Sequence, residues 1–202
     1  MAITGSQQAA PRPGRSAQRE ATRARLFEET VREFRERGFA ATEVSVVTDR
    51  VGLSRGAFYV HFTGKDAVLR ELLLLEERRI AEEVVRAAGP TLRELLGAVV
   101  DVVFASEDRL GRGLVRDLCA AQFRPEFVQL LTVEDHPLGT MLVEEIHRRA
   151  PGVEPVDTAM VFLTGLFGLL ATDDASVAER RRRTDLLVTL VTPTESGDEG
   201  RH

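Results

Sequence analysis

Residues 54–65 include the side chains best suited to contact another macromolecule. Arg55 carries a planar guanidinium, which can donate two parallel hydrogen bonds to O6 and N7 of guanine. Gly56 and Ala57 follow with almost no side chain, so a helix that begins here can approach base edges closely. Tyr59, the only tyrosine of the chain, lies one helical turn from Arg55. This combination indicates an element that enters a DNA groove.

Two short helices and a tight turn are predicted to position these side chains. Valines recur at i, i+3 and i+7 over residues 44–51, which predicts one stripe of a short helix, with Thr42 as its N-cap. Gly52 ends this helix, because glycine tolerates the left-handed backbone found just past a helix end. Ser54 is then expected to cap a second helix over residues 55–62, so that the two helices cross steeply.

A longer helix is expected to support this turn motif. It runs from near Arg19 to Arg37, with apolar residues on one stripe, and Gly38 stops it. Residues 1–17 are rich in Gln, Ala, Pro, Gly and Arg without an apolar period, so disorder is expected there. The arginines of this arm could contact DNA phosphates, but the sequence favours a solvated tail, because short tails with arginines are common. The DNA-binding domain is therefore placed at residues 18–64.

The chain resembles the TetR family of transcription regulators, most strongly from residue 23 to residue 69. The positions that fall at the spacings of the family's N-terminal signature are Phe34, Gly38, Phe39, Thr42, Gly52, Leu53, Ser54, Gly56, Phe58, Tyr59, His61, Phe62, Lys65 and Leu69. So many coincidences in one stretch are more specific than a short motif. The resemblance implies an all-α chain, in which a three-helix DNA-binding domain is fused to a divergent helical ligand-binding domain and works as a two-fold dimer.

The resemblance also implies which residues contact DNA. Those near bases or adjacent backbone are Ser45, Arg55, Gly56, Ala57 and Tyr59, and the phosphate contacts are Thr42, Ser54, Tyr59, His61 and Lys65. Taken alone, Tyr59 also fits a packed helix edge and Lys65, the only lysine, a solvated charge. Glu43, Thr48, Val51 and Gly64 depart from the family pattern. Glu43 suits a helix N-terminus but would repel a phosphate, so no DNA contact is assigned to it.

Charge is distributed unevenly along the chain. Residues 1–65 hold 11 basic and 7 acidic side chains, a balance of +4, whereas residues 66–202 hold 16 and 25, a balance of -9. The N-terminal third is therefore the part that can approach DNA.

Catalytic and metal chemistry finds little support in the sequence. Glu144 and His147 have the spacing of half a carboxylate-bridged metal site, but no second Glu-x-x-His exists. His136 would lie about 16 Å from His147 along a shared helix, too far to share a metal. Cys119, the sole cysteine, fits a small buried apolar residue better than a nucleophile. We therefore expect no enzyme activity, no metal and no cofactor.

Compartment signals point to a cytoplasmic protein. A single cysteine allows no intrachain disulfide, which fits a reducing compartment. No signal peptide opens the chain. The longest apolar stretch, residues 159–171, is interrupted by Thr164 and is too short to span a bilayer. No membrane partner is expected.

Downstream the pattern is helical throughout, with no alternating strand runs. Helices are expected at about residues 66–88, 91–106, 108–121, 125–131, 137–149, 155–171 and 176–191. The ligand-binding and dimerisation domain is placed at residues 65–192, and residues 193–202 are expected to be frayed.

Self-association is expected in the last two long helices. Residues 156–171 are apolar nearly all round, so more than one side must be covered. Two glycines allow close backbone approach, and the expected seam is Gly165, Gly168, Leu187, Leu190 and Val191. The arginine run at residues 180–183 could suggest nucleic acid, but such runs are usually solvated or ion-paired.

An effector cavity is expected among the helices after residue 91. Its candidate liners are Phe104, Arg116, Leu118, Phe123, Phe127, Leu131, Met141, Phe162 and Phe167, each of which also fits simple core. Arg116, Asp117, Gln122 and Arg124 are candidate polar anchors for a partly apolar ligand. The leading hypothesis is a ligand-responsive repressor that binds palindromic operator DNA as a dimer and is released by a small molecule. The alternative is a helical small-molecule-binding or adaptor module without direct promoter control.

Overall fold

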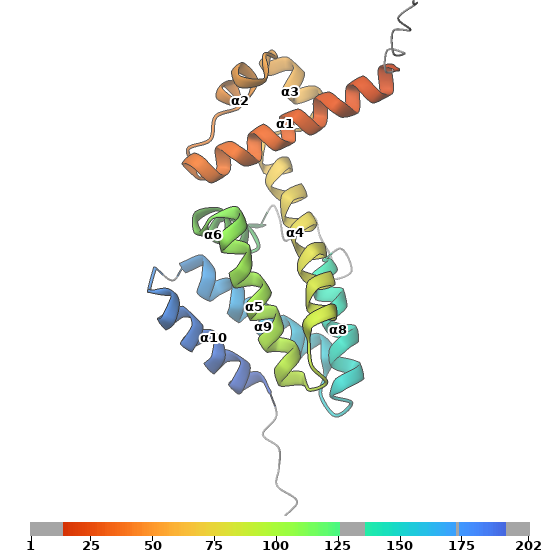
Figure 1. Ribbon diagram of the computed structural model, residues 1–202, viewed down its shortest axis with the longest axis vertical. Coiled ribbons are helices and arrows are strands. Elements are labelled where there is room, and N and C mark those ends of the chain that lie inside the picture. Colours follow the sequence, from red (N-terminus) through yellow and green to blue (C-terminus); the bar gives the residue numbers. More distant parts are fainter. Residues whose placement is uncertain (1–13, 126–135, 173, 193–202) are drawn as a thin grey trace, which may run out of the picture.

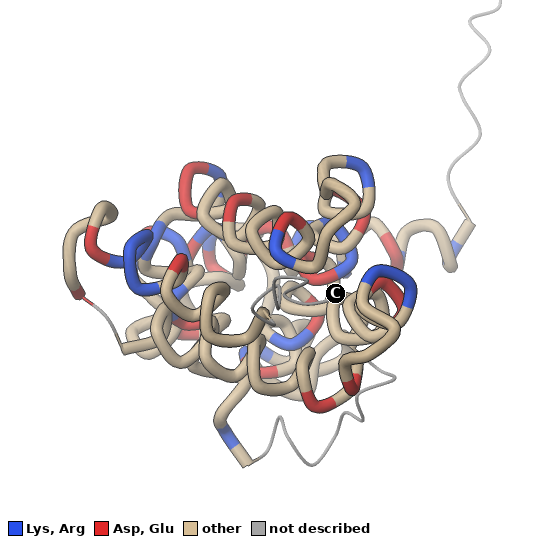
Figure 2. Tube along the Cα trace, turned by 90° about the horizontal axis from the view of Figure 1, so that it is seen from below, with Lys and Arg blue, Asp and Glu red and all other residues tan. Residues whose placement is uncertain are grey.

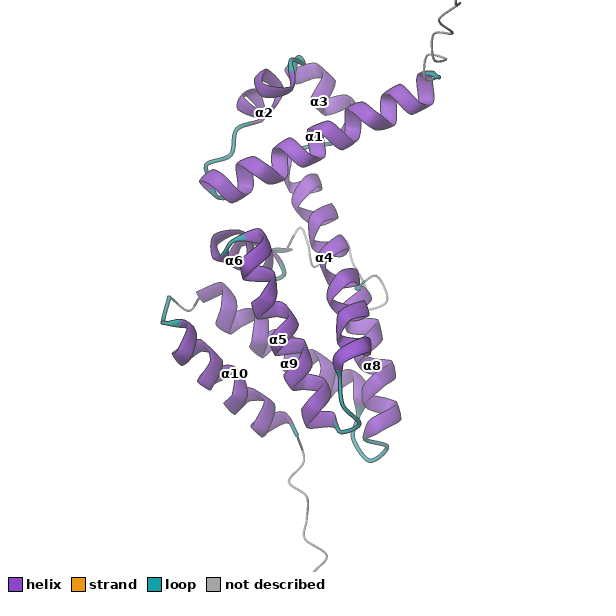
Figure 3. Cartoon of the chain, in the orientation of Figure 1, coloured by secondary structure: helices purple, strands orange, loops and turns teal. Residues whose placement is uncertain are grey.

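The computed structural model describes residues 14–125, 136–172 and 174–192, and every regular element within these ranges is a helix (Figures 1 and 3). The helices are α1 (Arg15–Arg37), α2 (Val44–Val51), α3 (Arg55–His61), α4 (Lys65–Ala87), α5 (Leu92–Leu110), α6 (Arg112–Ala121), α8 (Pro137–Arg149), α9 (Pro155–Thr172) and α10 (Val177–Val191). The predicted all-α fold is confirmed. The predicted helix at 125–131 and the frayed tail at 193–202 lie almost wholly or wholly outside the described residues.

Helices α1, α2 and α3 form a head at one end of the elongated molecule, and α4 runs from it into the larger helical body (Figure 1). The head packs around four side chains with no exposed surface, Leu26, Phe34, Val47 and Phe58. Helix α1 begins at Arg15 rather than near Arg19, so the expected disordered arm is shorter by at least three residues. Residues 1–13 lie outside the described part of the chain.

Local capping chemistry sets the turn between α2 and α3 as predicted. Gly52 has φ 71° and ψ 36°, the left-handed conformation, and its N–H donates back to α2 carbonyls. The Ser54 hydroxyl accepts a hydrogen bond from the Ala57 N–H and caps α3. The prediction that Thr42 caps α2 is wrong, because Glu43 occupies that position without a side-chain cap and the Thr42 hydroxyl donates instead to the Gly38 carbonyl.

The body consists of α5, α6, α8, α9 and α10 around the lower part of α4. Helix α9 packs against α6, α8 and α10, and α4 packs against α5 and α8. Helices α5 and α10 each begin with a capping box, formed by Thr91 with Glu94 and by Ser176 with Glu179. Seen from below, positions of both charge signs are interspersed over the helices (Figure 2). The observed helix ends lie within about four residues of the predicted ones, the usual uncertainty of such boundaries.

Helix α9 retains an apolar surface that its own subunit does not cover. Its 18 residues have a mean hydropathy of 1.5, so by length and composition alone it is long enough to cross a membrane, whereas only 22% of it is buried. The expected apolar stretch of 13 residues is thus part of a longer helix. Because α9 packs on three helices of the body, its remaining apolar face is available for one further surface.

Candidate nucleic-acid interface and effector cavity

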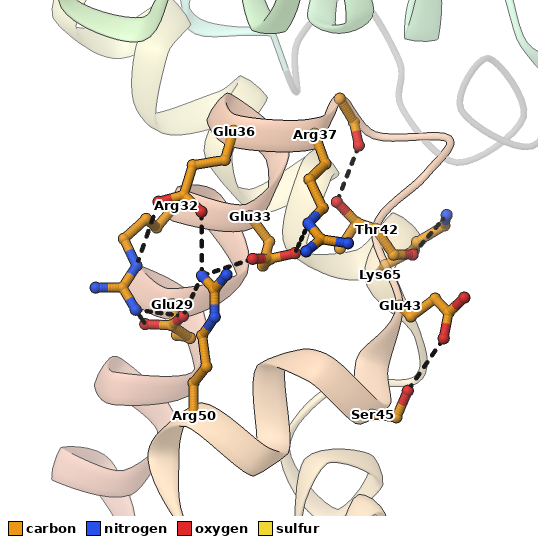
Figure 4. Close-up of polar contacts among 11 residues, drawn as sticks. Glu29, Arg32, Glu33, Glu36, Arg37, Thr42, Glu43, Ser45, Arg50 and Lys65 are labelled. Carbon is orange, nitrogen blue, oxygen red and sulfur yellow. Dashed lines mark hydrogen bonds and ion pairs between the residues drawn. The ribbon is translucent and has the colours of Figure 1, made fainter.

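A partly buried ion-pair network fixes α2 on α1 (Figure 4). Arg50 of α2 reaches three carboxylates of α1 with one nitrogen, at 3.2 Å to Glu29, 2.6 Å to Glu33 and 3.2 Å to Glu36. Hydrogen bonds to Glu29 and Glu36 raise the pKa of the Arg50 guanidinium. Arg50 therefore joins α2 to α1, with its guanidinium committed to these three carboxylates.

The leading end of α3 faces solvent. Arg55 and Gly56 are exposed, Ala57 is half-buried, and Tyr59 is 52% exposed with its ring edge against Phe58. No described residue accepts a hydrogen bond from the Arg55 guanidinium, so its donors point outward uncommitted. This is the geometry that bidentate base readout requires.

Two further predicted DNA contacts lie beside this end. Ser45 is half-buried in the first turn of α2, and its hydroxyl donates to the Glu43 carboxylate at 3.3 Å. His61 is half-buried at the end of α3 and lines an open groove between α1 and α4 with Arg23 and Arg70.

Thr42 and Lys65 are engaged inside the protein. The Lys65 ammonium donates to the carbonyl oxygens of Phe39, Ala40 and Thr42 at 2.8, 3.0 and 3.1 Å. An ammonium has three N–H donors, so these contacts use all of them. Thr42 is buried, and its hydroxyl is bonded to Gly38. Both residues hold the loop between α1 and α2 (Figure 4).

The same loop joins the head to the body. The Phe39 N–H donates to the Asp117 carboxylate of α6 at 2.8 Å. The Arg124 guanidinium lies 4.8 Å from the centre of the Phe39 ring, and the Lys65 ammonium 4.7 Å from it. Asp117 and Arg124 therefore connect α6 and the residues after it to the loop at the base of α2.

Two adjoining cavities lie in the body below this junction, with volumes of about 40 and 310 Å³. Both are lined by Glu77 of α4, Gln122, Leu138 of α8 and Phe167 of α9. The larger one also has Phe123, His136, Met160 and Leu163 in its wall. Their walls are mostly apolar, with Glu77 and Gln122 as shared polar groups, Glu76 and Ser106 in the smaller cavity, and His136 and Thr164 in the larger one.

The predicted liners are partly brought together. Leu118, Phe123 and Phe167 line these cavities, whereas Phe104, Arg116, Met141 and Phe162 do not. Two guanidiniums, those of Arg180 and Arg181, cover the Phe104 ring, and Arg116 pairs with Asp174. Phe162 is fully buried, and Met141 lines a separate open groove. Phe127 and Leu131 lie outside the described residues.

Glu77 and His136 were missed as cavity residues. The Glu77 carboxylate is only 3% exposed, accepts a hydrogen bond from the Gln122 amide at 2.9 Å and lies 2.9 Å from Nδ1 of His136. A carboxylate within a run of charged residues on a long helix looks solvated in the sequence. The available signal was its position four residues after the apolar Leu73, on the buried stripe of α4.

Cys119 is the buried apolar residue that was expected. It is a free thiol in the wall of the smaller cavity. Burial, and secondarily the charge of Glu107, raise the pKa of the Cys119 thiol to about 12. The thiol therefore stays neutral and is a poor nucleophile.

The head alone is enough to recognise the family. The family model described as bacterial regulatory proteins, tetR family, matches residues 26–72, which include α2, α3 and the loop held by Lys65. The chain belongs to the TetR family. Members of this family are helix-turn-helix transcription regulators rather than enzymes, in agreement with the sequence interpretation.

A curated TetR-type relative matches the same region. The uncharacterized HTH-type transcriptional regulator YerO of Bacillus subtilis (strain 168) is 42% identical over 45 residues, which is 22% of this chain and 16% of that protein. The likeness is therefore one of DNA-binding heads, and it carries no information on the body.

Solved TetR-family structures extend the likeness to the whole fold. FadR of Thermus thermophilus, a repressor in complex with lauroyl-CoA, has a TM-score of 0.65 at 19% identity and covers 89% of this chain and 100% of that one. SmeT, repressor of the multidrug efflux pump SmeDEF of Stenotrophomonas maltophilia, has a TM-score of 0.58 at 20% identity, with coverages of 86% and 89%. This TetR-family chain thus shares the fold of these solved structures, although its sequence identity to them is only 19–20%.

Two residues of the predicted dimer seam, Gly165 and Leu187, contact each other within the chain. A side chain at Gly165 would meet the methyl groups of Leu187 at 2.9 and 3.0 Å, so this glycine allows α9 and α10 of one chain to pack closely. Gly168 faces Phe123, 3.9 Å from where its Cβ would lie. Leu190 is 74% exposed, and Leu186 of the same helix and Val161 of α9, which packs against α10, are also exposed. In this TetR-family chain the uncovered apolar face is therefore Val161, Leu186 and Leu190.

Two residues of the arginine run are ion-paired, as expected. The Arg180 guanidinium is buried and bonds Glu107 of α5 at 2.8 Å, and Arg181 bonds Asp101. These pairs tie α10 to α5.

Proposed function

We propose that this chain is a ligand-responsive repressor that binds palindromic operator DNA as a dimer in the cytoplasm. The observation that carries this proposal is the exposed leading end of α3, with Arg55 at its start, on a head in which Arg50 and Lys65 are bonded within the chain. The proposed DNA contacts are Ser45, Ser54, Arg55, Gly56, Ala57, Tyr59 and His61. Arg55 reads bases, and the remaining side chains and the α3 N-terminus contact the backbone.

Thr42 and Lys65 take a different role from the one the family resemblance implied. Their polar groups hold the loop between α1 and α2, which sets the height and tilt of α3. Their substitution should weaken DNA binding through the stability of the head. It should not lower the salt dependence of binding, because the salt dependence counts phosphates that are directly neutralised.

The exposed apolar face of α9 and α10 is the proposed dimer interface. A palindrome presents two half-sites about 34–36 Å apart or more, so two recognition helices in a fixed relation are needed. A second copy packed on Val161, Leu186 and Leu190 would cover the surface that one subunit leaves exposed.

The two adjoining cavities are the proposed effector site. Solved relatives include FadR with lauroyl-CoA, so a body of this fold can hold a small molecule. The cavities lie against α6, whose Asp117 holds the loop at the base of the head. An effector that shifts α6 can therefore change the spacing of the two recognition helices, and the coupling between effector and DNA must be reciprocal.

A footprint on DNA from the chain's own promoter region is the primary test. We expect protection of a palindrome, and Arg55→Ala should cost about 1–3 kcal/mol per base contact while relaxing sequence choice. Arg86→Ala, at the far end of α4, is the matched control and should leave affinity unchanged. Absence of any protected palindrome would favour an adaptor module, and equal losses for cognate and random DNA would remove Arg55 from base readout.

The dimer interface has its own test. Leu186→Glu combined with Leu190→Glu should give a folded monomer with only non-specific DNA affinity, because unpaired carboxylates in an apolar seam are costly. Leu187 is avoided because it packs on Gly165 within the chain. Val177→Glu, an exposed change of the same kind at the other end of α10, serves as control. A double variant that sediments as a dimer would place the interface elsewhere.

A further inference from the structure

Five glutamates are buried in the described part of the chain, and four of them have arginine partners. Glu29 and Glu33 bind Arg50, Glu76 binds Arg79 and Arg109, and Glu145 binds Arg148 and Arg149. Pairing of this kind offsets the large cost of taking a carboxylate out of water. In the described residues Glu77 is the buried glutamate without an arginine or lysine partner.

The partners that Glu77 does have are weaker sources of positive charge. Gln122 is a neutral amide, and His136 carries a charge only when it is protonated. Its neighbour Glu76, which also lines the smaller cavity, is bonded by two arginines, Arg79 and Arg109. The contrast between these adjacent residues shows that α4 and α5 supply cations to one carboxylate and not to the other.

The walls of both cavities supply no permanent cation either. Neither cavity is lined by a lysine or arginine among the described residues. The linking segment 126–135 contains no lysine or arginine in its sequence and three acidic residues. Glu77 thus places a carboxylate, with Gln122 and His136 as its partners, at the shared wall of a cavity of about 310 Å³ that is otherwise mostly apolar.

Aromatic rings complete the environment of this charge. Phe123 and Phe167 lie in the wall of the larger cavity together with Met160. An aromatic face attracts a cation through its quadrupole, and the thioether is polarisable and adaptable. A carboxylate, two phenyl rings and aliphatic walls match a ligand with one positive charge on an apolar skeleton.

We infer that the effector of this chain is an apolar organic monocation, whose charged head binds at Glu77 and whose skeleton fills the cavity between α4, α6, α8 and α9. The inference rests on the proposed effector site and specifies its chemistry. The ligand cation pairs with the Glu77 carboxylate in the way that arginine side chains pair with the other buried glutamates. The positive charge at Glu77 thus comes from the ligand and not from an arginine or lysine of the chain.

The test uses three probes with one skeleton, 4-phenylbutylammonium, 4-phenylbutanol and 4-phenylbutyrate, in calorimetric titration of the full chain. We expect the ammonium to bind about tenfold or more tightly than the alcohol, and the carboxylate to bind weakest, as close charge pairs in desolvated sites require. Glu77→Gln should abolish the preference for the ammonium and leave affinity for the alcohol within about threefold. Glu82→Gln, an exposed change of the same kind on α4, should preserve the preference.

A second variant keeps the test decisive if Glu77→Gln does not fold. His136→Gln retains a hydrogen-bond donor but removes the imidazole, so preference for the ammonium should persist or increase. The inference is overturned if 4-phenylbutyrate binds most tightly, if Glu77→Gln binds the ammonium like the wild type, or if none of the probes binds. Calorimetry needs no DNA, so failure of the operator footprint with intact ammonium binding would reject the repressor function alone.

Discussion

The head and the effector cavity bury carboxylates in opposite ways. In the head, Glu33 is fully buried and meets Arg50 at 2.6 Å, so the charge serves to lock α2 on α1. In the cavity, Glu77 is almost as deeply buried and meets only an amide and an imidazole. The head is built to present one unchanging surface. The cavity leaves an interaction to be completed, which is what a site needs if ligand binding is to favour one state over another.

The largest expected effect is a difference in the loss of unfolding free energy between a core phenylalanine of the head and a phenylalanine of the cavity wall. Phe58→Ala removes a ring with no exposed surface from the head and should cost about 3–5 kcal/mol of unfolding free energy. Phe123→Ala, at a ring that is 48% exposed on the cavity rim, should cost far less. Chemical denaturation of both variants measures the difference. Similar losses would mean that the cavity wall is packed like core and has no room for a ligand.

Replacing Glu33 by glutamine should lower the free energy of unfolding, whereas the same replacement at Glu77 should not. Glu33→Gln should cost about 2–3 kcal/mol, less than a fully buried pair, because Arg50 is partly exposed and keeps two other carboxylates. Glu77→Gln should be neutral or stabilising in the absence of ligand, since the amide oxygen still accepts from Gln122 and no charge is left buried. A large loss for Glu77→Gln would mean that its charge is already balanced within the chain.

Lys65 and Arg55 are both basic, but they differ in their hydrogen bonds. The Lys65 ammonium donates to three carbonyl oxygens of the chain, whereas no hydrogen bond from the Arg55 guanidinium to a described residue is found. Lys65→Met should lower the stability of the chain by about 1.5–2 kcal/mol through loss of three charged hydrogen bonds, without changing the slope of DNA affinity against salt. Arg55→Ala should leave thermal stability unchanged and alter DNA binding alone. A lower salt slope for Lys65→Met would instead assign its ammonium to a phosphate.

Glycine substitutions should distinguish the strained turn from the body helices. Gly52→Ala places a side chain at φ 71° and should destabilise the chain by about 1 kcal/mol. Gly97→Ala, in the interior of α5 with open space around its added methyl, should stabilise it by about 0.5–1 kcal/mol. Thermal melts of the pair provide the measurement, and a stabilising Gly52→Ala would contradict the left-handed turn.

The smallest effect concerns the Cys119 thiol in the cavity wall. Burial raises its pKa to about 12 in the folded chain, so near neutral pH the thiol is uncharged in both states and contributes no pH dependence. As pH rises above the ordinary thiol value towards 12, only the unfolded chain ionises, and stability is lost over that window. Cys119→Ala should flatten this alkaline loss. An unchanged alkaline profile would mean that another group causes it.

The turn motif could be predicted from the sequence because its determinants are local. Gly52 ends α2 by its backbone freedom, and Ser54 caps α3 because its hydroxyl accepts from the Ala57 N–H, three residues later. Both act within a few residues, so spacing alone fixes them. The family resemblance over the same stretch rests on the same local constraints, and the all-α fold follows from helical periodicity that holds throughout the described chain.

Only the tertiary structure decided what the charged residues and interface glycines do. Lys65 looks identical in sequence whether it faces phosphate or three carbonyls, and Gly165 whether it faces a second subunit or Leu187 of its own. Glu76 and Glu77 are chemically identical neighbours. Successive residues on a helix point about 100° apart, so Glu76 meets Arg109 from α5 while Glu77 meets Gln122 and His136. That choice depends on how α5, α6 and α8 pack around α4, which no local pattern encodes.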